Sequence, residues 1–353
     1  MSLQKAFDRF LPQIETELQE IVRLPHPRLG TYYGMMRYHL GWVDRDLRPH
    51  EARSGKRLRP VLCLLCCQAA GGDPLEALPA AAAVELVHNF SLVHDDIQDA
   101  SHFRRGRRAV WDLWGAPHAI NVGDGLFTLA RLALHRLAAR GVALERIQAA
   151  TLALDRACLA LCEGQYFDMT FEDQLDVDLD QYLWMIRHKT ATLLATSAQL
   201  GAILATDKVE LIEHYYRFGE NLGLAFQIQD DILGAWGDEE VTGKSAATDI
   251  RDKKKTLPVV YVLNHPEERI SAWELIDLYS QEGALDEDDI KATLALLERT
   301  GARAYAEDQA EQYHRQAMES LDKTGRPRHS SGSENAAQSA LRELAASLLG
   351  RET

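Results

Sequence analysis

The segment Phe90-Ser-Leu-Val-His-Asp-Asp-Ile-Gln-Asp99 places three carboxylates at the end of an apolar helical pattern. Asp95 and Asp99 are four residues apart, so both project from the same face of a helix. Asp96 lies about 100° away around the helix axis. A solvated acidic turn would also explain the acids. However, Arg104-Arg105-Gly106 follows them, and carboxylates beside apolar residues and arginines suit Mg²⁺ that bridges to a phosphorylated ligand.

A second acidic pair repeats this arrangement in Ile228-Gln-Asp-Asp-Ile-Leu-Gly234, after another apolar run. We expect the two helices to face each other across a bundle, with Asp230 and Asp231 opposite the first cluster. The two clusters could then hold several Mg²⁺ ions, whose charge would neutralise a diphosphate that carboxylates alone repel.

Cationic residues that could bind phosphate groups lie in three other segments. Gly55-Lys-Arg-Leu-Arg-Pro60 is a compact basic cluster, Lys189-Thr190 begins an uncharged stretch, and Thr242-Gly-Lys244 follows the second acidic pair. Arginine forks and lysine point charges are common ligands of phosphate oxygens. Each motif alone is also compatible with a solvated basic loop.

The composition and periodicity predict a single all-α domain over residues 1–353. The net charge of −14 disfavours general nucleic-acid binding, while 46% apolar and 26% charged residues are typical of a globular protein. No alternating β-branched run predicts a substantial sheet. The polar segment 323–334 is interpreted as a mobile connection between helices. Helices are predicted over 3–23, 32–48, 56–71, 76–99, 117–139, 143–171, 179–204, 207–236, 250–264, 284–323 and 334–349.

The lack of a recognisable targeting signal and the pattern of cysteines predict a cytoplasmic protein. The N-terminal segment carries acids such as Asp8 and Glu15 among its apolar residues, which is not typical of a signal or transit peptide. The uncharged stretch 190–206 contains polar side chains, so we interpret it as a buried helix and expect no transmembrane segment. Five cysteines without a secretion signal indicate reduced thiols, and Cys63-x-x-Cys66 lacks the second pair that a zinc site needs.

The order of these motifs resembles that of the trans-isoprenyl diphosphate synthases, the polyprenyl synthetase family, and in particular its short-chain members. GKRLRP is followed by H-x6-DDxxD-x4-RRG, then by GQ, KT, FQxxDD and TGK-x4-D, over roughly residues 30–265. The resemblance implies an all-α isoprenoid-synthase-type helical bundle around a deep central cavity. It further implies a homodimer with about three Mg²⁺ ions in each active site.

The same resemblance implies a role for each matching residue. The metal ligands would be Asp95, Asp99 and Asp230, supported by Asp96 and Asp231. The family commonly has a third aspartate at the position of Gly234, and Asp238, about one turn further on, is the candidate substitute. The allylic diphosphate would be held by Arg104, Lys189, Thr190, Gln227 and Lys244. The pocket for isopentenyl diphosphate would be formed by Gly55, Lys56, Arg59, His88 and Arg105. Gln165 would lie inside the cavity, near the reacting carbons.

The implied reaction is a head-to-tail condensation. Loss of pyrophosphate from dimethylallyl, geranyl or farnesyl diphosphate would give an allylic cation, which the isopentenyl double bond attacks. Water would destroy the cation, so the cavity should be apolar and closed. Phe90 lies a little over one turn before Asp95, and Ser91 is small. This combination resembles synthases that make C15 to C20 products, with geranylgeranyl slightly preferred.

Two other functions stay open. The spacing Asp230, Gly234, Asp238 loosely resembles the second metal motif of class I terpene cyclases, but a cyclase needs no isopentenyl site. A non-catalytic subunit of a heteromeric synthase could lose its acids, whereas both acidic pairs are present here.

Overall fold

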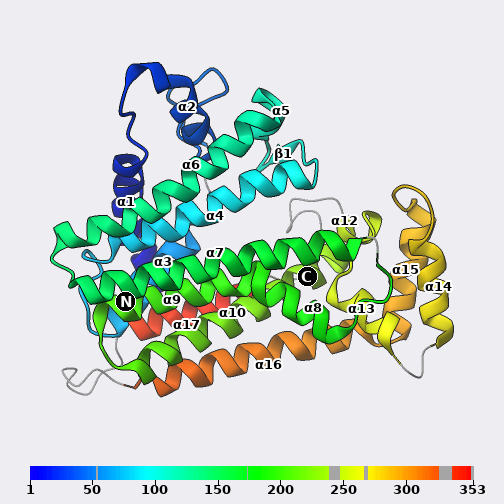
Figure 1. Ribbon diagram of the computed structural model, residues 1–353. Coiled ribbons are helices and arrows are strands. Elements are labelled where there is room, and N and C mark those ends of the chain that lie inside the picture. The colour runs from blue at the N-terminus through cyan, green and yellow to red at the C-terminus, as the bar shows by residue number, and fades with distance from the viewer. Residues whose placement is uncertain (53–54, 173, 238–246, 266–268, 326–335, 351–353) are drawn as a thin grey trace. The chain divides into compact units, whose positions relative to one another are not determined.

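The computed structural model describes residues 1–52, 55–172, 174–237, 247–265, 269–325 and 336–350. Most of these residues are helical, and their strands form one antiparallel pair of two residues each (Figure 1). The all-α prediction is therefore confirmed. The chain divides into two compact units: unit 1 comprises residues 1–158, 196–213 and 336–341, and unit 2 comprises residues 159–195, 214–325 and 342–350, apart from the gaps given above.

Unit 1 is built around one central helix, α4 (Leu78–Gln98), which packs against α1, α3 and α6. Every residue from 78 to 87 is buried, as expected for a helix that is apolar on all sides. The other elements of unit 1 are α1 (Leu3–Ile21), η1 (Pro27–Leu29), α2 (Gly30–His39), α3 (Leu58–Ala69), β1 (Phe103–Arg104), β2 (Arg107–Arg108), α5 (Val110–Trp114), α6 (Ala116–His135) and η2 (Arg136–Arg140).

Unit 2 contains two apolar clusters. One includes Tyr182, Leu224 and Val260, and the other joins Ile250 to Leu275. Its elements are α8 (Leu179–Ile186), η3 (Arg187–Ala191), α12 (Thr248–Arg251), α13 (Leu257–Asn264), α14 (Arg269–Tyr279), α15 (Glu287–Arg299) and α16 (Ala302–Lys323). Four helices contribute residues to both units: α7 (Leu144–Glu172), α9 (Thr192–Ala205), α10 (Val209–Trp236) and α17 (Ala336–Leu349).

Several predicted helices are shorter or broken. The helix predicted over 32–48 ends at His39, close to Gly41 with φ 90°. Positive φ at Lys253 (54°) and Gly301 (72°) interrupts those predicted over 250–264 and 284–323. These backbone angles are incompatible with a continuous α-helix. The segment 190–206 is largely buried as predicted, and no described helix is both long and apolar enough to cross a bilayer.

Candidate active site

The predicted site residues fall into two groups, one in each unit. Unit 1 contains the first acidic motif and the residues assigned to the isopentenyl pocket, and unit 2 contains the second acidic motif with Gln165, Lys189 and Thr190. Asp95 and Asp230 belong to different units, so their predicted approach across a bundle stays a prediction. Lys244 and Asp238 lie outside the described residues.

The first acidic motif ends α4. Asp95 is half-buried, Asp99 is the exposed C-cap, and Asp96 is buried. The Oδ1 atom of Asp96 accepts hydrogen bonds from Nε of Arg104 at 2.7 Å and lies 2.6 Å from Nη2. Burial raises the pKa of Asp96 to about 6, although the Arg104 guanidinium opposes this shift. Asp96 therefore anchors Arg104, while Asp95 and Asp99 occupy more accessible positions.

The β1–β2 hairpin places two of the predicted arginines. Arg104 pairs with Arg107 across the hairpin. The connecting residues Arg105-Gly106 both have positive φ, 53° and 75°, as a type I′ turn requires. Arg107 then fixes the hairpin by donating to the carbonyls of Tyr38 at 2.9 Å and Val43 at 2.7 Å. The Arg-Arg-Gly motif is thus a tight turn that presents Arg104 and Arg105 in defined directions.

Gly55 and Arg105 lie against each other. Gly55 has φ 86°, a conformation that favours glycine, and a Cβ built on it would lie 3.0 Å from Cζ of Arg105. A side chain at position 55 would therefore push the guanidinium away. Lys56 follows and is exposed. The glycine of this motif is explained by close contact with the arginine of the hairpin.

Arg59 and His88 lie in the same electrostatic environment. Burial lowers the pKa of both Arg59 and Arg105, and the carboxylate of Glu85 opposes the shift in each. Burial, followed by the charges of Arg59 and Arg105, holds the pKa of His88 well below its usual range. The Nε atom of Arg59 is buried and has no hydrogen-bond partner among the described residues. The positive charges of Arg59 and Arg105, with neutral His88 beside them, make this cluster suited to an anionic ligand.

His39, at the end of α2, is a further member of this cluster that the sequence analysis missed. Burial and the charges of Arg105 and Arg104 lower the pKa of His39 to about 3. Its Nε2 atom is buried, and within the described part of the chain it has no hydrogen-bond partner. No motif contains His39, and the predicted helix continues past it, so no local sequence signal places it in this cluster.

The second acidic motif, on α10, is organised like the first. Asp231 is buried, while Asp230 is half-buried. Oδ2 of Asp231 accepts hydrogen bonds from the backbone N–H of Leu257 at 2.9 Å and from the Tyr182 hydroxyl, and Oδ1 accepts one from Nε2 of Gln227 at 3.1 Å. Burial raises the pKa of Asp231 to about 7, and these hydrogen bonds oppose the shift. Asp231 therefore fixes its neighbours, including Gln227 of the predicted site.

Lys189 and Thr190 lie in η3, a π-helical turn in which the N–H of Thr192 donates to the carbonyl of Arg187. Such turns are rare in proteins, and those that occur are often found at functional sites. The Thr190 hydroxyl donates to Oε1 of Gln227 at 2.8 Å, and the Lys189 ammonium forms an ion pair with Asp168 of α7. Asp168 is another residue that the sequence analysis missed, although it lies only three positions after the predicted Gln165.

Two glycines allow η3 to approach its neighbouring helices. A Cβ on Gly164 of α7 would overlap the backbone of Lys189, and a Cβ on Gly223 of α10 would lie 2.5 Å from Cα of Ala191. The glycines of the GQ motif and of the apolar run before FQxxDD are therefore needed for packing. Gln165, next to Gly164, is half-buried, and in the described chain its Nε2 atom has no partner.

The missing third acid of the second motif has a packing explanation. A Cβ on Gly234 would overlap the buried carboxylate of Asp249, which belongs to α12. No side chain fits at position 234 without movement of Asp249. Asp249, which pairs with Lys254 at 3.4 Å, thus occupies the space that a third acid would fill.

The predicted chain-length residue Phe90 is 8% exposed and packs edge to face against Phe127 of α6, with ring centroids 5.2 Å apart. Its other aromatic neighbour is His94 at 5.9 Å. Ser91 donates a hydrogen bond to the carbonyl of His88 at 2.8 Å. Phe90 and Phe127 together form an aromatic pair below the first acidic motif on α4.

The acidic residues fit Mg²⁺ that is shared with a ligand. Within the described residues, no three His, Cys, Asp or Glu side chains form a metal site by themselves. Mg²⁺ is usually bound by one or two carboxylates together with substrate phosphates and water. Asp95 and Asp99, four residues apart on α4, provide such a pair of oxygen ligands.

Comparison with known proteins identifies the family of the chain. The polyprenyl synthetase family matches residues 43–297. The chain is 41% identical to the (2E,6E)-farnesyl diphosphate synthase of Mycobacterium tuberculosis H37Rv over 293 residues, which cover 82% of this chain and 80% of the relative. It is also 41% identical to the geranylgeranyl diphosphate synthase of the same organism over 287 residues, which cover 81% and 80%.

Solved structures show the same fold. A polyprenyl synthetase from Streptomyces coelicolor A3(2) superposes with a TM-score of 0.85 at 33% identity, covering 98% of each chain. A geranylgeranyl pyrophosphate synthetase from Pyrococcus horikoshii Ot3 gives a TM-score of 0.85 at 33% identity, covering 99% of each. The predicted isoprenoid-synthase-type fold is confirmed. By sequence and by fold, the chain belongs to the polyprenyl synthetase family and is a prenyltransferase.

Proposed function

We propose that this chain condenses isopentenyl diphosphate with an allylic diphosphate (dimethylallyl, geranyl or farnesyl) to form a short-chain all-trans prenyl diphosphate and pyrophosphate. The cluster of the buried Arg59 and Arg105 guanidinium groups with neutral His88 is the observation that carries the proposal. This cluster is assigned to isopentenyl diphosphate, whereas Arg104, which is held by Asp96, is assigned to the allylic diphosphate. A chain-elongating enzyme needs two anion sites, whereas a cyclase needs one.

Asp95, Asp99 and Asp230 would hold Mg²⁺ in the proposed reaction. When bound, the metal supplies positive charge that makes pyrophosphate a better leaving group. Asp96 and Asp231 act indirectly in this proposal, because each is buried and hydrogen-bonded to other site residues. In each pair, one acid therefore binds the metal and the other positions neighbouring site residues.

The remaining residues bind and orient the two substrates. Arg104, Lys189 and Lys244 would contact the allylic diphosphate, with Thr190 and Gln227 fixed to each other beside it. Lys189 would exchange its ion pair with Asp168 for phosphate oxygens. Gly55, Lys56, Arg59, His88 and Arg105 would hold isopentenyl diphosphate so that its double bond meets the allylic cation. Departing pyrophosphate would take the proton, while Gln165 lies near the reacting carbons.

Product length is proposed to be C15 to C20, with geranylgeranyl slightly preferred. The farnesyl and geranylgeranyl diphosphate synthases are equally similar to this chain, at 41% identity. The aromatic pair of Phe90 and Phe127 is the structural support for a short product, because a growing apolar chain would meet these rings beneath the first acidic motif.

A homodimer is proposed from the surface of α7. Leu152, Leu159 and Tyr166 are 51%, 62% and 64% exposed and are spaced seven residues apart, so they share one face of the helix. A second copy of the chain would cover this apolar stripe. Light scattering after size-exclusion chromatography should give twice the mass of one chain, whereas a mass of one chain would contradict the homodimer.

The proposed reaction is tested by product chromatography. Purified protein is incubated with Mg²⁺, labelled isopentenyl diphosphate and each allylic starter in turn. Labelled C15 or C20 diphosphates are the expected products. A hydrocarbon formed from an allylic diphosphate alone would instead indicate a cyclase, and a protein that is inert until a partner synthase is added would indicate a non-catalytic subunit.

A further inference from the structure

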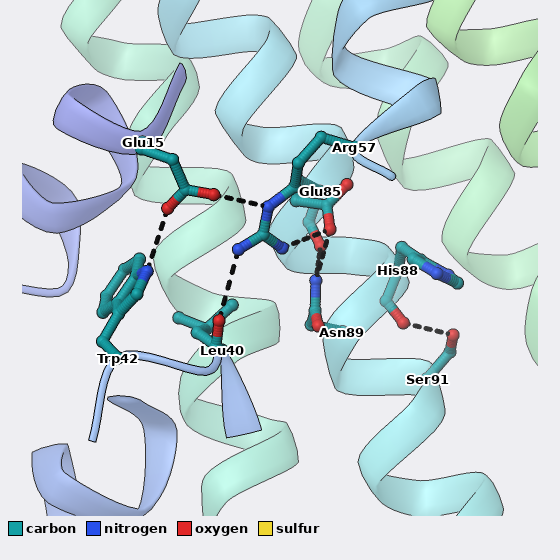
Figure 2. Close-up of polar contacts among 8 residues, drawn as sticks. All are labelled: Glu15, Leu40, Trp42, Arg57, Glu85, His88, Asn89 and Ser91. Atoms are coloured by element: carbon teal, nitrogen blue, oxygen red, sulfur yellow. Dashed lines mark hydrogen bonds and ion pairs between the residues drawn. The ribbon is translucent and has the colours of Figure 1, made fainter. Parts of the chain in front are cut away.

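Arg57 is buried at the centre of the basic motif and binds three other segments of unit 1 (Figure 2). Its Nε donates to Glu15 Oε1 at 2.8 Å, and Nη1 donates to Glu85 Oε1 at 2.7 Å. Its Nη2 donates to the carbonyl of Leu40 at 3.3 Å. Arg57 therefore joins α1, the end of α2 and α4 at the start of α3.

Both carboxylates that bind Arg57 are themselves held in place. Glu15 Oε2 accepts a hydrogen bond from Nε1 of Trp42 at 2.9 Å. Glu85 Oε1 accepts a second hydrogen bond from Nδ2 of Asn89 at 2.8 Å, as Figure 2 shows. The network can therefore hold the guanidinium in one orientation.

The backbone of Arg57 is strained in a way that this network explains. Arg57 has φ 48° and ψ 38°, the left-handed conformation that non-glycine residues rarely adopt. Burial of a guanidinium between carboxylates is also costly compared with an apolar core. Strained residues that are fixed by their surroundings cluster at functional sites, where the strain serves pre-organisation.

The conformation of Arg57 decides where its neighbours point. Lys56 directly precedes it, and Arg59 lies two residues later in the first turn of α3. Gly55, on the other side of Lys56, contacts the Arg105 guanidinium. If Arg57 left its partners, the turn into α3 could relax, and these phosphate-binding groups would lose their mutual arrangement.

We propose that Arg57 is a positioning residue for the isopentenyl diphosphate site, and that Glu15 of α1 belongs to that site through it. Bridged between Glu15 and Glu85, Arg57 fixes the turn in which Lys56 and Arg59 meet the diphosphate. Helix α1 lies outside the residues 43–297 that match the family. The inference rests on the proposed function.

The test compares two glutamates of the same helix. Glu15→Gln weakens the contact with Arg57. Glu17→Gln is the matched control, because Glu17 is also paired, with Arg136 Nε and Arg140 Nη2 at 2.8 Å each, but does not contact the basic motif. Glu15→Gln should raise KM for isopentenyl diphosphate about fivefold to tenfold, with kcat and the allylic KM nearly unchanged.

The Glu17→Gln control should lower the melting temperature at least as much, because Glu17 is the more buried of the two, yet leave both KM values unchanged. Arg57→Lys should raise KM for isopentenyl diphosphate as Glu15→Gln does, since lysine keeps the charge but cannot bridge two carboxylates. If Glu15→Gln does not fold, Trp42→Phe replaces it, with a KM increase of about two- to threefold expected.

A wild-type KM for isopentenyl diphosphate in Glu15→Gln would overturn the inference. So would an equal rise of this KM in Glu17→Gln, or an equal rise of the KM for the allylic diphosphate in Glu15→Gln. Titration calorimetry with isopentenyl diphosphate alone measures the same effect as a Kd, independent of turnover. A wild-type chain that binds isopentenyl diphosphate without condensing it would overturn the proposed function, and the Kd comparison would still decide the role of Arg57. No binding by the wild-type chain would overturn both.

Discussion

At each acidic motif, two neighbouring aspartates have different environments. Asp96 and Asp231 are buried and hydrogen-bonded, whereas Asp95 and Asp230 are half-buried. Helical spacing alone predicted that Asp95 and Asp99 share a face. It could not predict which acid is buried, because most of the hydrogen-bond partners come from other elements. Arg104 reaches Asp96 from the hairpin.

His39 gives a prediction for the pH dependence of stability. Its pKa falls from 6.5 to about 3 through burial and the charges of Arg105, Arg104, Arg57 and Arg107. Between these values the unfolded chain binds a proton that the folded chain does not, so this histidine lowers the free energy of unfolding by about 1 kcal/mol for each pH unit below 6.5. The stability it contributes is fully present above pH 6.5.

Substitution of His39 isolates this contribution. Between pH 7 and pH 5, the free energy of unfolding should fall less in His39→Asn than in the wild-type protein. The difference between the two decreases should be about 1 to 2 kcal/mol. Urea denaturation at several pH values measures the difference. Parallel pH profiles for the two proteins would show that His39 is not held neutral.

At the level of elements, periodicity predicts where helices exist better than where they break. The π-helical turn η3 interrupts a segment that was predicted as one helix over 179–204, because its position depends on close packing against Gly164 and Gly223. Helix α14 was not predicted at all. Its buried face consists of Ser271, Leu275 and Tyr279, whereas the large apolar side chains of Ile270 and Trp273 are 76% and 71% exposed, so its apolar residues do not follow one face.

Substitution at Gly164 tests the packing of η3. Gly164→Ala should displace Lys189, raise KM for the allylic diphosphate and lower the free energy of unfolding by about 1 to 3 kcal/mol, because the added methyl group overlaps backbone. Gly30→Ala is the control, since a Cβ at Gly30 has no heavy atom within 4 Å. Equal stability and KM in both variants would disprove the role assigned to Gly164.

At the level of the whole molecule, the order of motifs predicted the family and the fold, while two groups of site residues lie in separate units. The sequence shows which residue types recur at which spacing, and this pattern predicts the acids and the basic residues as candidate site residues. It could not show that His39 and Asp168 lie beside these motifs, or that Glu15 and Glu85 bind Arg57 of the basic motif, because only tertiary packing brings these residues together.

Product length is a property of the whole cavity that one substitution can test. Phe90→Ala should shift products to longer chains, since it removes one ring of the pair formed with Phe127. Reversed-phase chromatography of dephosphorylated products measures the distribution. Ser91→Ala is a suitable control because it keeps the aromatic pair. An unchanged distribution in Phe90→Ala would show that this residue does not limit chain growth.

The sequence predicts that Asp95 and Asp230 act on one metal-bound diphosphate. Calorimetric binding of inorganic pyrophosphate in Mg²⁺ tests it in the wild-type protein, Asp95→Ala, Asp230→Ala and the double variant. If the ligand is shared, each single variant should weaken binding by about tenfold or more, and the double variant should bind little worse than either. Wild-type affinity in either single variant would contradict a shared ligand.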